Sequence, residues 1–281
     1  MAADAAHRSI DAAAHILAAA GIDTARLDAE LLMAAACGME RAAIVTGSCE
    51  PDSAALARLE ALVARRAQRE PLAYLTGHRE FYGLDLTVSP AVLIPRPETE
   101  TVVDGVLAWL ADRPEARVLD LGTGSGCIAI AIAANAPRAR VVASDISAEA
   151  LEVARANASR LRLAERIEFV CSDLFEAFAG ARFDLVVSNP PYVEDSAALA
   201  PEVERYEPRA ALFAGADGLA FHRRMAAALA AQLAPGGAAI VEVGAGQAAA
   251  VAALMRAAGA SETVVMCDLA GVERVVQARF A

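Results

Sequence analysis

The sequence predicts an α/β protein with a doubly wound, largely parallel sheet, preceded by a small helical bundle. From Arg117 onward, short apolar strand-like segments alternate with helical segments, which is the pattern of such a sheet. Before about residue 70, apolar residues recur at spacings of three and four, which is typical of amphipathic helices. Ligands bind open α/β sheets at the carboxyl ends of the strands, so we expect the functional residues there.

The N-terminal segment is expected to form four helices. Gly21 ends the first, Gly38 ends the second, a short third covers residues 39–45, and Pro51-Asp52 opens the fourth. The apolar stripes expected to form the bundle core are Ile10, Ala13, Ala14 and Leu17; Leu27, Leu31, Ala34 and Ala35; and Leu56, Leu59, Leu62 and Val63. Residues 76–97 read as a hairpin linker, with alternating apolar positions from Glu80 to Val88.

The second half supplies the expected strands and helices. A helix runs through Trp109, and two more are expected over about residues 218–233 and 247–258. The expected strands cover residues 117–121, 140–144, 167–171, 183–188, 238–243, 263–267 and 272–280. The last two strands are close enough in sequence to pair antiparallel.

Composition narrows the functional classes. The 281 residues are 57 % hydrophobic, which is ample for a substantial core. The net charge of −11, without a basic tail or stripe, counts against a nucleic-acid partner. All 25 basic residues are Arg, so a P-loop lysine, Schiff-base chemistry and a catalytic lysine are excluded.

The distribution of cysteines and histidines predicts that the protein resides in a reducing compartment and holds no metal site. The cysteines are odd in number, scattered and never in a Cys-x-x-Cys pair: Cys37, Cys49, Cys127, Cys171 and Cys267. The four histidines are equally dispersed, and His78, near the hairpin, is expected to be a surface residue. The N-terminus lacks the apolar core of a signal peptide, and no run reaches the ~18 apolar residues of a membrane span. We therefore expect a cytoplasmic protein.

A glycine-rich turn follows the first strand of the α/β region. Gly122-Thr123-Gly124-Ser125-Gly126 separates this strand from a helix over Cys127–Asn135. Glycines let a backbone approach a ligand closely, and the helix N-terminus favours negative charge. Proteins that bind NAD, FAD or S-adenosyl-L-methionine (AdoMet) share such turns. The spacing here departs from the dinucleotide fingerprint Gly-x-Gly-x-x-Gly.

Two carboxylates end the next two strands. Asp145 is placed to hold both hydroxyls of a ribose, as acids do at this position in nucleotide-binding folds. Asp173 lies near where an adenine amino group would be. Both could instead be solvated strand-end carboxylates, but their order after the glycine turn favours a nucleoside site.

Asn189-Pro190-Pro191-Tyr192 directly follows the strand over residues 183–188. The prolines lack N–H groups, so this segment offers carbonyl acceptors and the Asn189 amide oxygen, with few donors. Tyr192 adds a flat face for stacking. The motif is typical of a clamp for a planar NH2 group of glutamine, adenine or guanine. An ordinary strand-ending turn is the alternative.

These blocks together resemble the PrmC/HemK family of glutamine methyltransferases that modify peptide-chain release factors. The resemblance covers nearly the whole chain from Pro71 and, more weakly, the helical N-terminus. The segments that carry it are 71–74, 80–84, 92–100, 120–130, 172–175 and 188–192. A related family acting on a ribosomal-protein glutamine lacks the Pro-Glu-Thr-Glu run found at 97–100.

The resemblance implies a helical substrate-recognition domain over residues 1–75, the hairpin linker and a methyltransferase domain over residues 98–281. It implies the class I AdoMet-dependent, Rossmann-like fold, with a seven-stranded, mostly parallel sheet and an antiparallel C-terminal strand. The implied reaction methylates the amide nitrogen (N5) of the glutamine in the Gly-Gly-Gln motif of class 1 release factors. We expect a monomer with AdoMet as cofactor and with no metal, membrane or direct nucleic-acid partner.

The resemblance also assigns site residues. The cofactor residues are Gly122, Thr123, Gly124, Ser125 and Gly126 at the methionine end, Asp145 at the ribose, and Asp173, Leu174 and Asn189. The residues for the glutamine amide are Asn189, Pro190, Pro191 and Tyr192, with Asn189, Pro190 and Tyr192 carrying the catalytic step. Arg96 and Glu98 lie in a family block without an assigned role, and a salt bridge at the helix start explains them equally well. No general base is evident.

Two other functions compete with this interpretation. A methyltransferase acting on an exocyclic amino group of adenine or guanine in nucleic acid uses a similar clamp, but it predicts a basic face. A non-enzymatic AdoMet-binding module or assembly factor has no need of an acceptor-only clamp.

Overall fold

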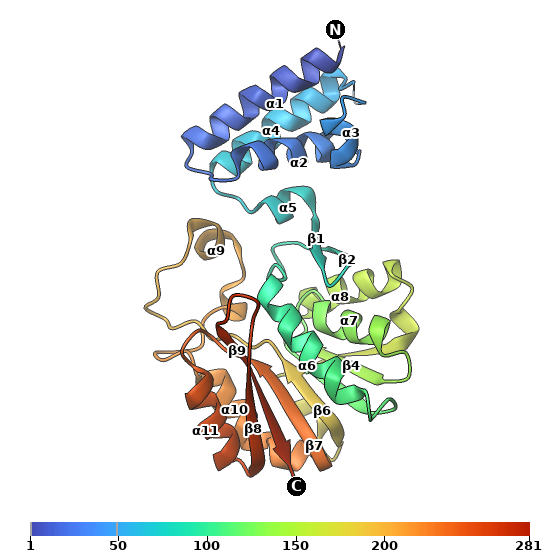
Figure 1. Cartoon of the computed structure of the whole chain (residues 1–281), viewed down its shortest axis with the longest axis vertical. Helices are drawn as coiled ribbons and strands as arrows, with labels where there is room; N and C mark the ends of the chain where they lie inside the picture. The colour runs from blue at the N-terminus through green and yellow to red at the C-terminus, as the bar shows by residue number, and fades with distance from the viewer. Residues whose placement is uncertain (1, 49) are drawn as a thin grey trace. The chain divides into compact units, whose positions relative to one another are not determined.

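The computed structural model describes residues 2–48 and 50–281, so Cys49 lies outside the described residues. Backbone contacts divide the chain into two compact units. One comprises Met1–His78 with Leu199–Tyr206, and the other comprises Arg79–Ala198 with Glu207–Ala281. Each is described by itself (Figure 1).

The first unit is a helical bundle, as predicted. Its helices are α1 (Ala2–Ala19), α2 (Ala25–Cys37), α3 (Arg41–Val45), α4 (Ser53–Ala67), α5 (Leu72–Thr76) and α9 (Pro201–Tyr206). Asp52 caps α4 by accepting a hydrogen bond from the Ala55 N–H at 2.7 Å. Ile10, Leu17, Leu59 and Val63 share one hydrophobic core, which confirms the expected faces of α1 and α4.

The expected face of α2 is wrong in part. Leu27 is 41 % exposed, and the side chains in the core include Ala29, Leu32, Met33 and Ala36. Helix α2 contacts α1, α3, α4 and α5, so it buries a wider arc than a helix at the edge of a bundle. In an alanine-rich helix the apolar positions cover several faces, and their spacing alone does not select one.

Helix α9 belongs to the helical unit although it follows β6 in the sequence. Its Glu202 accepts hydrogen bonds from Arg66 Nη1 at 3.4 Å and from Arg69 Nη2 at 3.1 Å. Arg66 also donates through Nε to the buried Asp28 at 2.8 Å. Ion pairs thus hold α9 within the helical unit, an arrangement without a local sequence signal.

The second unit contains a seven-stranded sheet in the order β5-β4-β3-β6-β7-β9-β8. Strands β3 to β7 run parallel to one another, whereas β9 is antiparallel to both β7 and β8, as the sequence predicts. The strands are β3 (Arg117–Leu121), β4 (Arg140–Asp145), β5 (Ile167–Cys171), β6 (Phe183–Ser188), β7 (Leu233–Glu242), β8 (Ala260–Cys267) and β9 (Glu273–Phe280). Strand β7 begins earlier than expected because Leu233 already pairs with Phe183.

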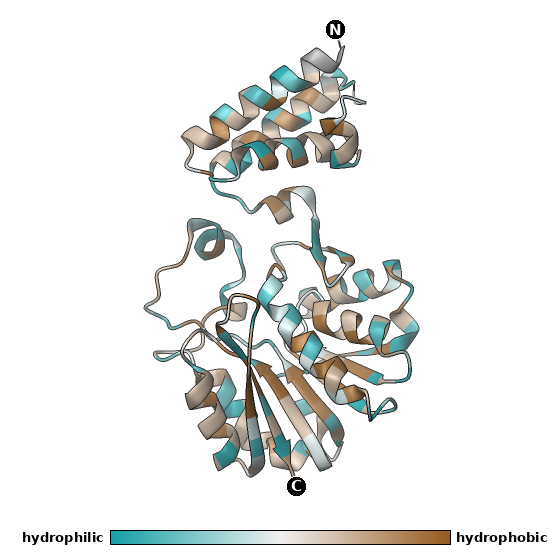
Figure 2. Ribbon diagram, in the orientation of Figure 1, coloured by the Kyte–Doolittle hydropathy of each residue, from teal (hydrophilic) through white to brown (hydrophobic). Residues whose placement is uncertain are grey.

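Helices cover both faces of this sheet (Figure 1). Val118 packs into a core cluster with residues of α6 and α7, whereas Leu119 packs into a second cluster with residues of α10 and α11. The strands are among the most hydrophobic parts of the chain (Figure 2). The helices are α6 (Glu100–Leu110), α7 (Cys127–Asn135), α8 (Ala148–Arg160), α10 (Ala220–Gln232) and α11 (Ala248–Ala257), with short 3₁₀ turns η1 (Pro97–Thr99), η2 (Ala164–Arg166), η3 (Glu176–Phe178) and η4 (Arg209–Ala211).

The predicted hairpin is formed by β1 (His78–Phe81) and β2 (Leu84–Thr87). Tyr82 and Gly83 both have positive φ, as a tight hairpin turn requires. The buried Asn157 of α8 pairs with the Thr87 backbone and also donates to the Ser125 carbonyl at 3.0 Å. The hairpin is thereby tied to the glycine-rich turn. None of the described helices is long and apolar enough to cross a membrane.

Candidate active site

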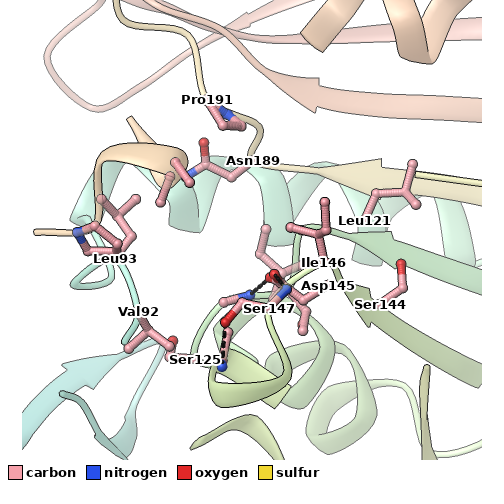
Figure 3. Close-up of a pocket in the computed structure, with 18 of the residues that line it drawn as sticks. Val92, Leu93, Leu121, Ser125, Ser144, Asp145, Ile146, Ser147, Asn189 and Pro191 are labelled. Atoms are coloured by element: carbon pink, nitrogen blue, oxygen red, sulfur yellow. Dashed lines mark hydrogen bonds between the residues drawn. The ribbon is translucent and has the colours of Figure 1, made fainter. Parts of the chain in front are cut away.

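A cavity of about 380 Å³ lies in the second unit, at the carboxyl ends of β3, β4 and β6. Its walls come from the glycine-rich turn after β3, from residues 145–147 at the end of β4 and from Asn189 and Pro191 after β6. Figure 3 shows Asn189 and Pro191 along one side of the cavity, with Asp145, Ile146 and Ser147 across from them. The volume is in the usual range for a small-molecule site, roughly 300–1,000 Å³.

The glycine-rich turn leaves room for a ligand at Gly122 and Gly124, whereas at Gly126 it packs closely against neighbouring helices. At Gly122 and Gly124, with φ of 70° and 55°, a Cβ would meet no atom within 4 Å, so the backbone is open to a ligand. At Gly126, with φ of 83°, a Cβ would lie 3.0 Å from Ile130 Cδ1 and 3.1 Å from Ala154 Cβ. Gly126 is therefore required for packing of the turn against α7 and α8.

Asp120 supports the turn from inside the sheet. The buried Oδ2 accepts a hydrogen bond from Thr123 Oγ1 at 2.6 Å and one from the Ala129 N–H at 3.2 Å. Burial raises the pKa of the Asp120 carboxyl to about 7, and these two donors oppose the rise. The other oxygen, Oδ1, is buried without a partner among the described residues.

Asp145 is fixed in orientation by two backbone donors. Its Oδ2 accepts from the Gly124 N–H and its Oδ1 from the Ser147 N–H, both at 2.9 Å. Burial raises the pKa of this carboxyl, and the backbone donors oppose it. The apolar side chain of Ile146 next to it is 64 % exposed and lines the cavity, as does Leu174. One fixed carboxylate between apolar surfaces suits a ribose with its planar base, so these residues fit AdoMet.

Asp173 and Leu174, which the sequence analysis assigned to the cofactor, both line the cavity. Asp173 Oδ2 accepts a hydrogen bond from Arg224 Nη2 at 2.8 Å. Leu174 has a φ of 48°, an uncommon conformation for a residue with a Cβ, and Ser172 Oγ donates to its carbonyl at 3.0 Å. The backbone of Leu174 is thereby held at the cavity wall.

The clamp segment, residues 189–192, lies partly at the cavity and partly in the protein interior. Asn189 and Pro191 line the cavity, whereas Pro190 is buried. Asn189 Nδ2 donates to the buried Thr99 Oγ1 at 3.0 Å, which leaves the acceptor Oδ1 for a ligand. Tyr192 Oη donates to Glu242 Oε1 at 3.1 Å, and burial followed by the charge of Glu242 raises the pKa of Tyr192.

Three residues of this site were missed in the sequence: Thr99, Glu242 and Gln247. Gln247 Nε2 donates to the Tyr192 carbonyl at 3.0 Å, and its Oε1 accepts from the Gly244 N–H at 2.9 Å. Glu242 is 1 % exposed, and burial raises its pKa to about 7. A carboxylate at the end of an apolar strand was a signal for Glu242, and Thr99 lies inside the family block at 92–100.

Arg96 forms a structural ion pair, but its partner is Glu207 and not a residue at the start of the helix. Its Nη2 donates to Glu207 Oε1 at 2.5 Å, and Glu207 Oε2 accepts from the Ile94 N–H at 3.1 Å. Glu98 lies in the 3₁₀ turn η1. Across residues 2–48 and 50–281, no group of three or more His, Cys, Asp or Glu side chains could hold a metal ion.

Comparison with known proteins identifies the family. Residues 9–77 match the profile described as PrmC N-terminal domain, and residues 104–206 match the profile described as Methyltransferase small domain. The chain is 45 % identical over 275 residues to the release factor glutamine methyltransferase of Cereibacter sphaeroides, covering 97 % of both chains. It is 47 % identical over 275 residues to that of Burkholderia pseudomallei, covering 95 % of this chain and 96 % of the relative.

The chain belongs to the release factor glutamine methyltransferase family. It is an AdoMet-dependent methyltransferase, as the resemblance in its motifs predicted.

The fold agrees with solved structures. A methyltransferase from Pyrococcus furiosus has a TM-score of 0.53 at 17 % identity, covering 77 % of this chain and 98 % of that one. A 16S rRNA methyltransferase from T. Thermophilus has a TM-score of 0.52 at 21 % identity, covering 73 % and 50 %.

Proposed function

We propose that this protein transfers a methyl group from AdoMet to the side-chain amide nitrogen (N5) of the glutamine in the Gly-Gly-Gln motif of class 1 release factors. The observation that carries the proposal is the hydrogen bond from Asn189 Nδ2 to Thr99 Oγ1, at 3.0 Å. It uses the donor of Asn189 and leaves its acceptor oxygen at the cavity, where an NH2 group is the complementary ligand. The relatives named release factor glutamine methyltransferase support the same substrate.

The chemistry follows from positioning. Bound AdoMet would supply an electrophilic methyl group: its S–C bond would break as the C–N bond forms, leaving the neutral thioether, and one amide proton would leave to water. An amide nitrogen is a weak nucleophile because its lone pair is delocalised. Asn189 Oδ1 and the Pro190 carbonyl would accept hydrogen bonds from the substrate NH2 and so orient its nitrogen toward the methyl group. Near-attack positioning of this kind, with reacting atoms roughly 3–3.5 Å apart, is a large source of rate acceleration. Apolar neighbours such as Pro191 exclude water from the cationic reacting centre.

Residues 122–126, Asp145, Asp173 and Leu174 would hold the cofactor, and the helical residues 1–75 would recognise the protein substrate. The helical unit exposes large apolar side chains suited to a protein surface: Ile16, Leu27, Met39 and Val45. A chain shortened to begin near Leu72 should methylate a short Gly-Gly-Gln peptide as the full chain does, but intact release factor far more slowly. An equal rate on intact factor would contradict the recognition role.

We further propose that the protein is a cytoplasmic monomer and that it does not act on nucleic acid.

The function is tested with labelled AdoMet and three substrates: intact release factor, the same factor with the Gly-Gly-Gln glutamine changed to alanine, and RNA. We expect label only in the intact factor, on the glutamine amide nitrogen by mass spectrometry. Label in RNA would favour the exocyclic amino-methyltransferase instead. Absence of label in all three, with AdoMet bound, would favour a binding module.

A further inference from the structure

Gln247, the residue before α11, joins three loops at the far end of the clamp segment. Its Nε2 donates to the Tyr192 carbonyl at 3.0 Å, and its Oε1 accepts from the Gly244 N–H at 2.9 Å. A longer contact of 3.5 Å runs from Nε2 to the Asp217 carbonyl. The side chain therefore links the residues after β6, the residues after β7 and the turn before α10.

The backbone partners determine which way the Gln247 amide points. A backbone N–H can only donate and a backbone carbonyl can only accept. The Gly244 N–H therefore requires Oε1 on its side, and the Tyr192 carbonyl requires Nε2 on the other. Turning the amide by half a turn would place donor against donor and acceptor against acceptor.

Two glycines make room for this contact. At Gly218, with φ of 69°, a Cβ would lie 2.3 Å from the Tyr192 oxygen and 2.6 Å from Gln247 Nε2. At Gly244, a Cβ would lie 2.8 Å from Gln247 Oε1 and 3.2 Å from Cδ2 of the Tyr192 ring. A side chain at either position would displace the Gln247–Tyr192 pair.

Tyr192 is held at both of its polar ends. Gln247 holds its carbonyl, and its hydroxyl donates to the buried Glu242 at 3.1 Å. The next residue, Val193, exchanges backbone hydrogen bonds of 2.8–2.9 Å with residues 212–214. The exit of the clamp segment is therefore fixed by contacts from several other parts of the chain.

The entry of the clamp segment is fixed by the sheet. Ser188, at the end of β6, pairs with both β3 and β7. Between Ser188 and Tyr192, the rings of Pro190 and Pro191 fix two of the φ angles, so few torsions remain free. Holding Tyr192 therefore determines where the Pro190 carbonyl and the Asn189 side chain lie.

We infer that Gln247 is a positioning residue for methyl transfer. By holding the Tyr192 carbonyl, it keeps the two acceptors of the clamp, Asn189 Oδ1 and the Pro190 carbonyl, in place for the substrate NH2. Gln247 itself lies outside the residues that line the cavity, so it acts through Tyr192. The inference rests on the proposed function, because these acceptors are the ones assigned there to the glutamine amide.

The test uses Gln247→Glu and Gln247→Met in the full chain. An ionised glutamate keeps the acceptor for the Gly244 N–H but has no donor for the Tyr192 carbonyl, and methionine loses both contacts. Gln277→Glu is the matched control, because Gln277 is half-buried in β9 and lies outside the cavity lining. We measure kcat and KM on release factor, and AdoMet affinity by calorimetry.

Both Gln247 variants should lower kcat about 10- to 100-fold at about pH 8, since misplacing a reacting group has effects of this size. KM for release factor and the dissociation constant for AdoMet should stay within about threefold of wild type, because the variants change only the placement of the clamp acceptors. The Gln277→Glu control should match wild type in all three quantities.

The glutamate variant has a further signature in its pH dependence. A protonated carboxyl can donate to the Tyr192 carbonyl as the amide does, and a carboxyl facing carbonyl oxygens titrates above its ordinary range. The ratio of kcat in Gln247→Glu to wild-type kcat should therefore rise as the pH falls from about 8.5 to 5.5, whereas the ratio for Gln247→Met should stay flat. The titratable groups nearby, Asp217, Glu242 and His222, are present in both proteins, so their titration cancels in the ratio.

Wild-type kcat in Gln247→Met, or a ratio for Gln247→Glu that does not change with pH, overturns the inference. A fall in AdoMet affinity as large as the fall in kcat also overturns it, because it would indicate a general loss of structure. A wild-type chain inactive on release factor overturns the proposed function, and the positioning role with it. An active wild type beside equally active variants overturns the positioning role alone.

Discussion

The two walls of the cavity are held in place in different ways. On the cofactor wall, Asp145 and the glycine-rich turn are fixed by backbone N–H groups, those of Gly124 and Ser147. On the clamp wall, Asn189 is fixed by a side chain 90 residues away in sequence, and Tyr192, which follows the cavity-lining Pro191, by one 50 residues away. The shape of the first wall comes from strand, turn and helix geometry, whereas the second depends on buried side chains from other segments.

Because the two walls are held differently, substitutions on them should affect different measured quantities. Changes on the cofactor wall should alter AdoMet affinity and leave the clamp in place. Changes on the clamp wall should alter turnover and leave AdoMet affinity nearly unchanged.

The largest effect is expected for Asn189→Ala. The substitution removes the acceptor for the substrate NH2 while both prolines keep the turn, so kcat should fall about 100-fold or more. AdoMet affinity by calorimetry should change only modestly. Asn189→Asp, which keeps an acceptor oxygen but loses the donor to Thr99, should retain more activity than the alanine variant. A wild-type rate in Asn189→Ala would refute the clamp.

Asp145→Ala should produce the opposite pattern. It removes the acceptor for two ribose hydroxyls, and hydrogen bonds to a charged group contribute about 1.5–3 kcal/mol each. The dissociation constant for AdoMet should rise about tenfold or more, with kcat at saturating AdoMet much less affected. An unchanged dissociation constant would remove Asp145 from the cofactor site.

Asp120→Asn should alter the pH dependence of stability. The pKa of Asp120 is raised by burial to about 7, above its ordinary value of 3.8, so its contribution to stability is present at low pH and lost as pH rises through about 7. The free energy of unfolding of the wild type should therefore fall between about pH 4 and 7. In Asp120→Asn, this fall should be smaller by about 1 kcal/mol or more in urea titrations, since a pKa unit corresponds to about 1.4 kcal/mol. Identical slopes in the two proteins would contradict a buried, titrating Asp120.

The smallest effect is expected for Asp173→Ala. Asp173 is partly exposed and bonded to Arg224, so a contact to an adenine amino group is screened by solvent. AdoMet affinity should fall about threefold. Arg224→Ala is the matched control: it removes the ion-pair partner and keeps the carboxylate, and should weaken AdoMet binding less. If Arg224→Ala weakens binding as much as Asp173→Ala, the ion pair and not the carboxylate acts on the cofactor.

Much of the fold could be predicted from the sequence because its signals are local. Strands β3, β5 and β6 and helix α7 have the predicted bounds, since each is an apolar run ended by glycine, proline or a polar residue. The antiparallel pairing of β8 with β9 followed from their proximity in the chain. The face of α2 and the packing of α9 could not be predicted, because an alanine-rich stripe selects no face and the partners of Glu202 lie more than 130 residues away.

The sequence by itself determined which groups the site contains: a glycine-rich turn before a helix, acids at the ends of two strands and an acceptor-rich Asn-Pro-Pro-Tyr segment. Backbone conformation and residue type are enough to specify these. The tertiary structure alone decided which atom of Asn189 is offered to a ligand. That choice depends on the buried Thr99, which is 90 residues away in sequence and accepts the hydrogen bond from the Asn189 amide nitrogen.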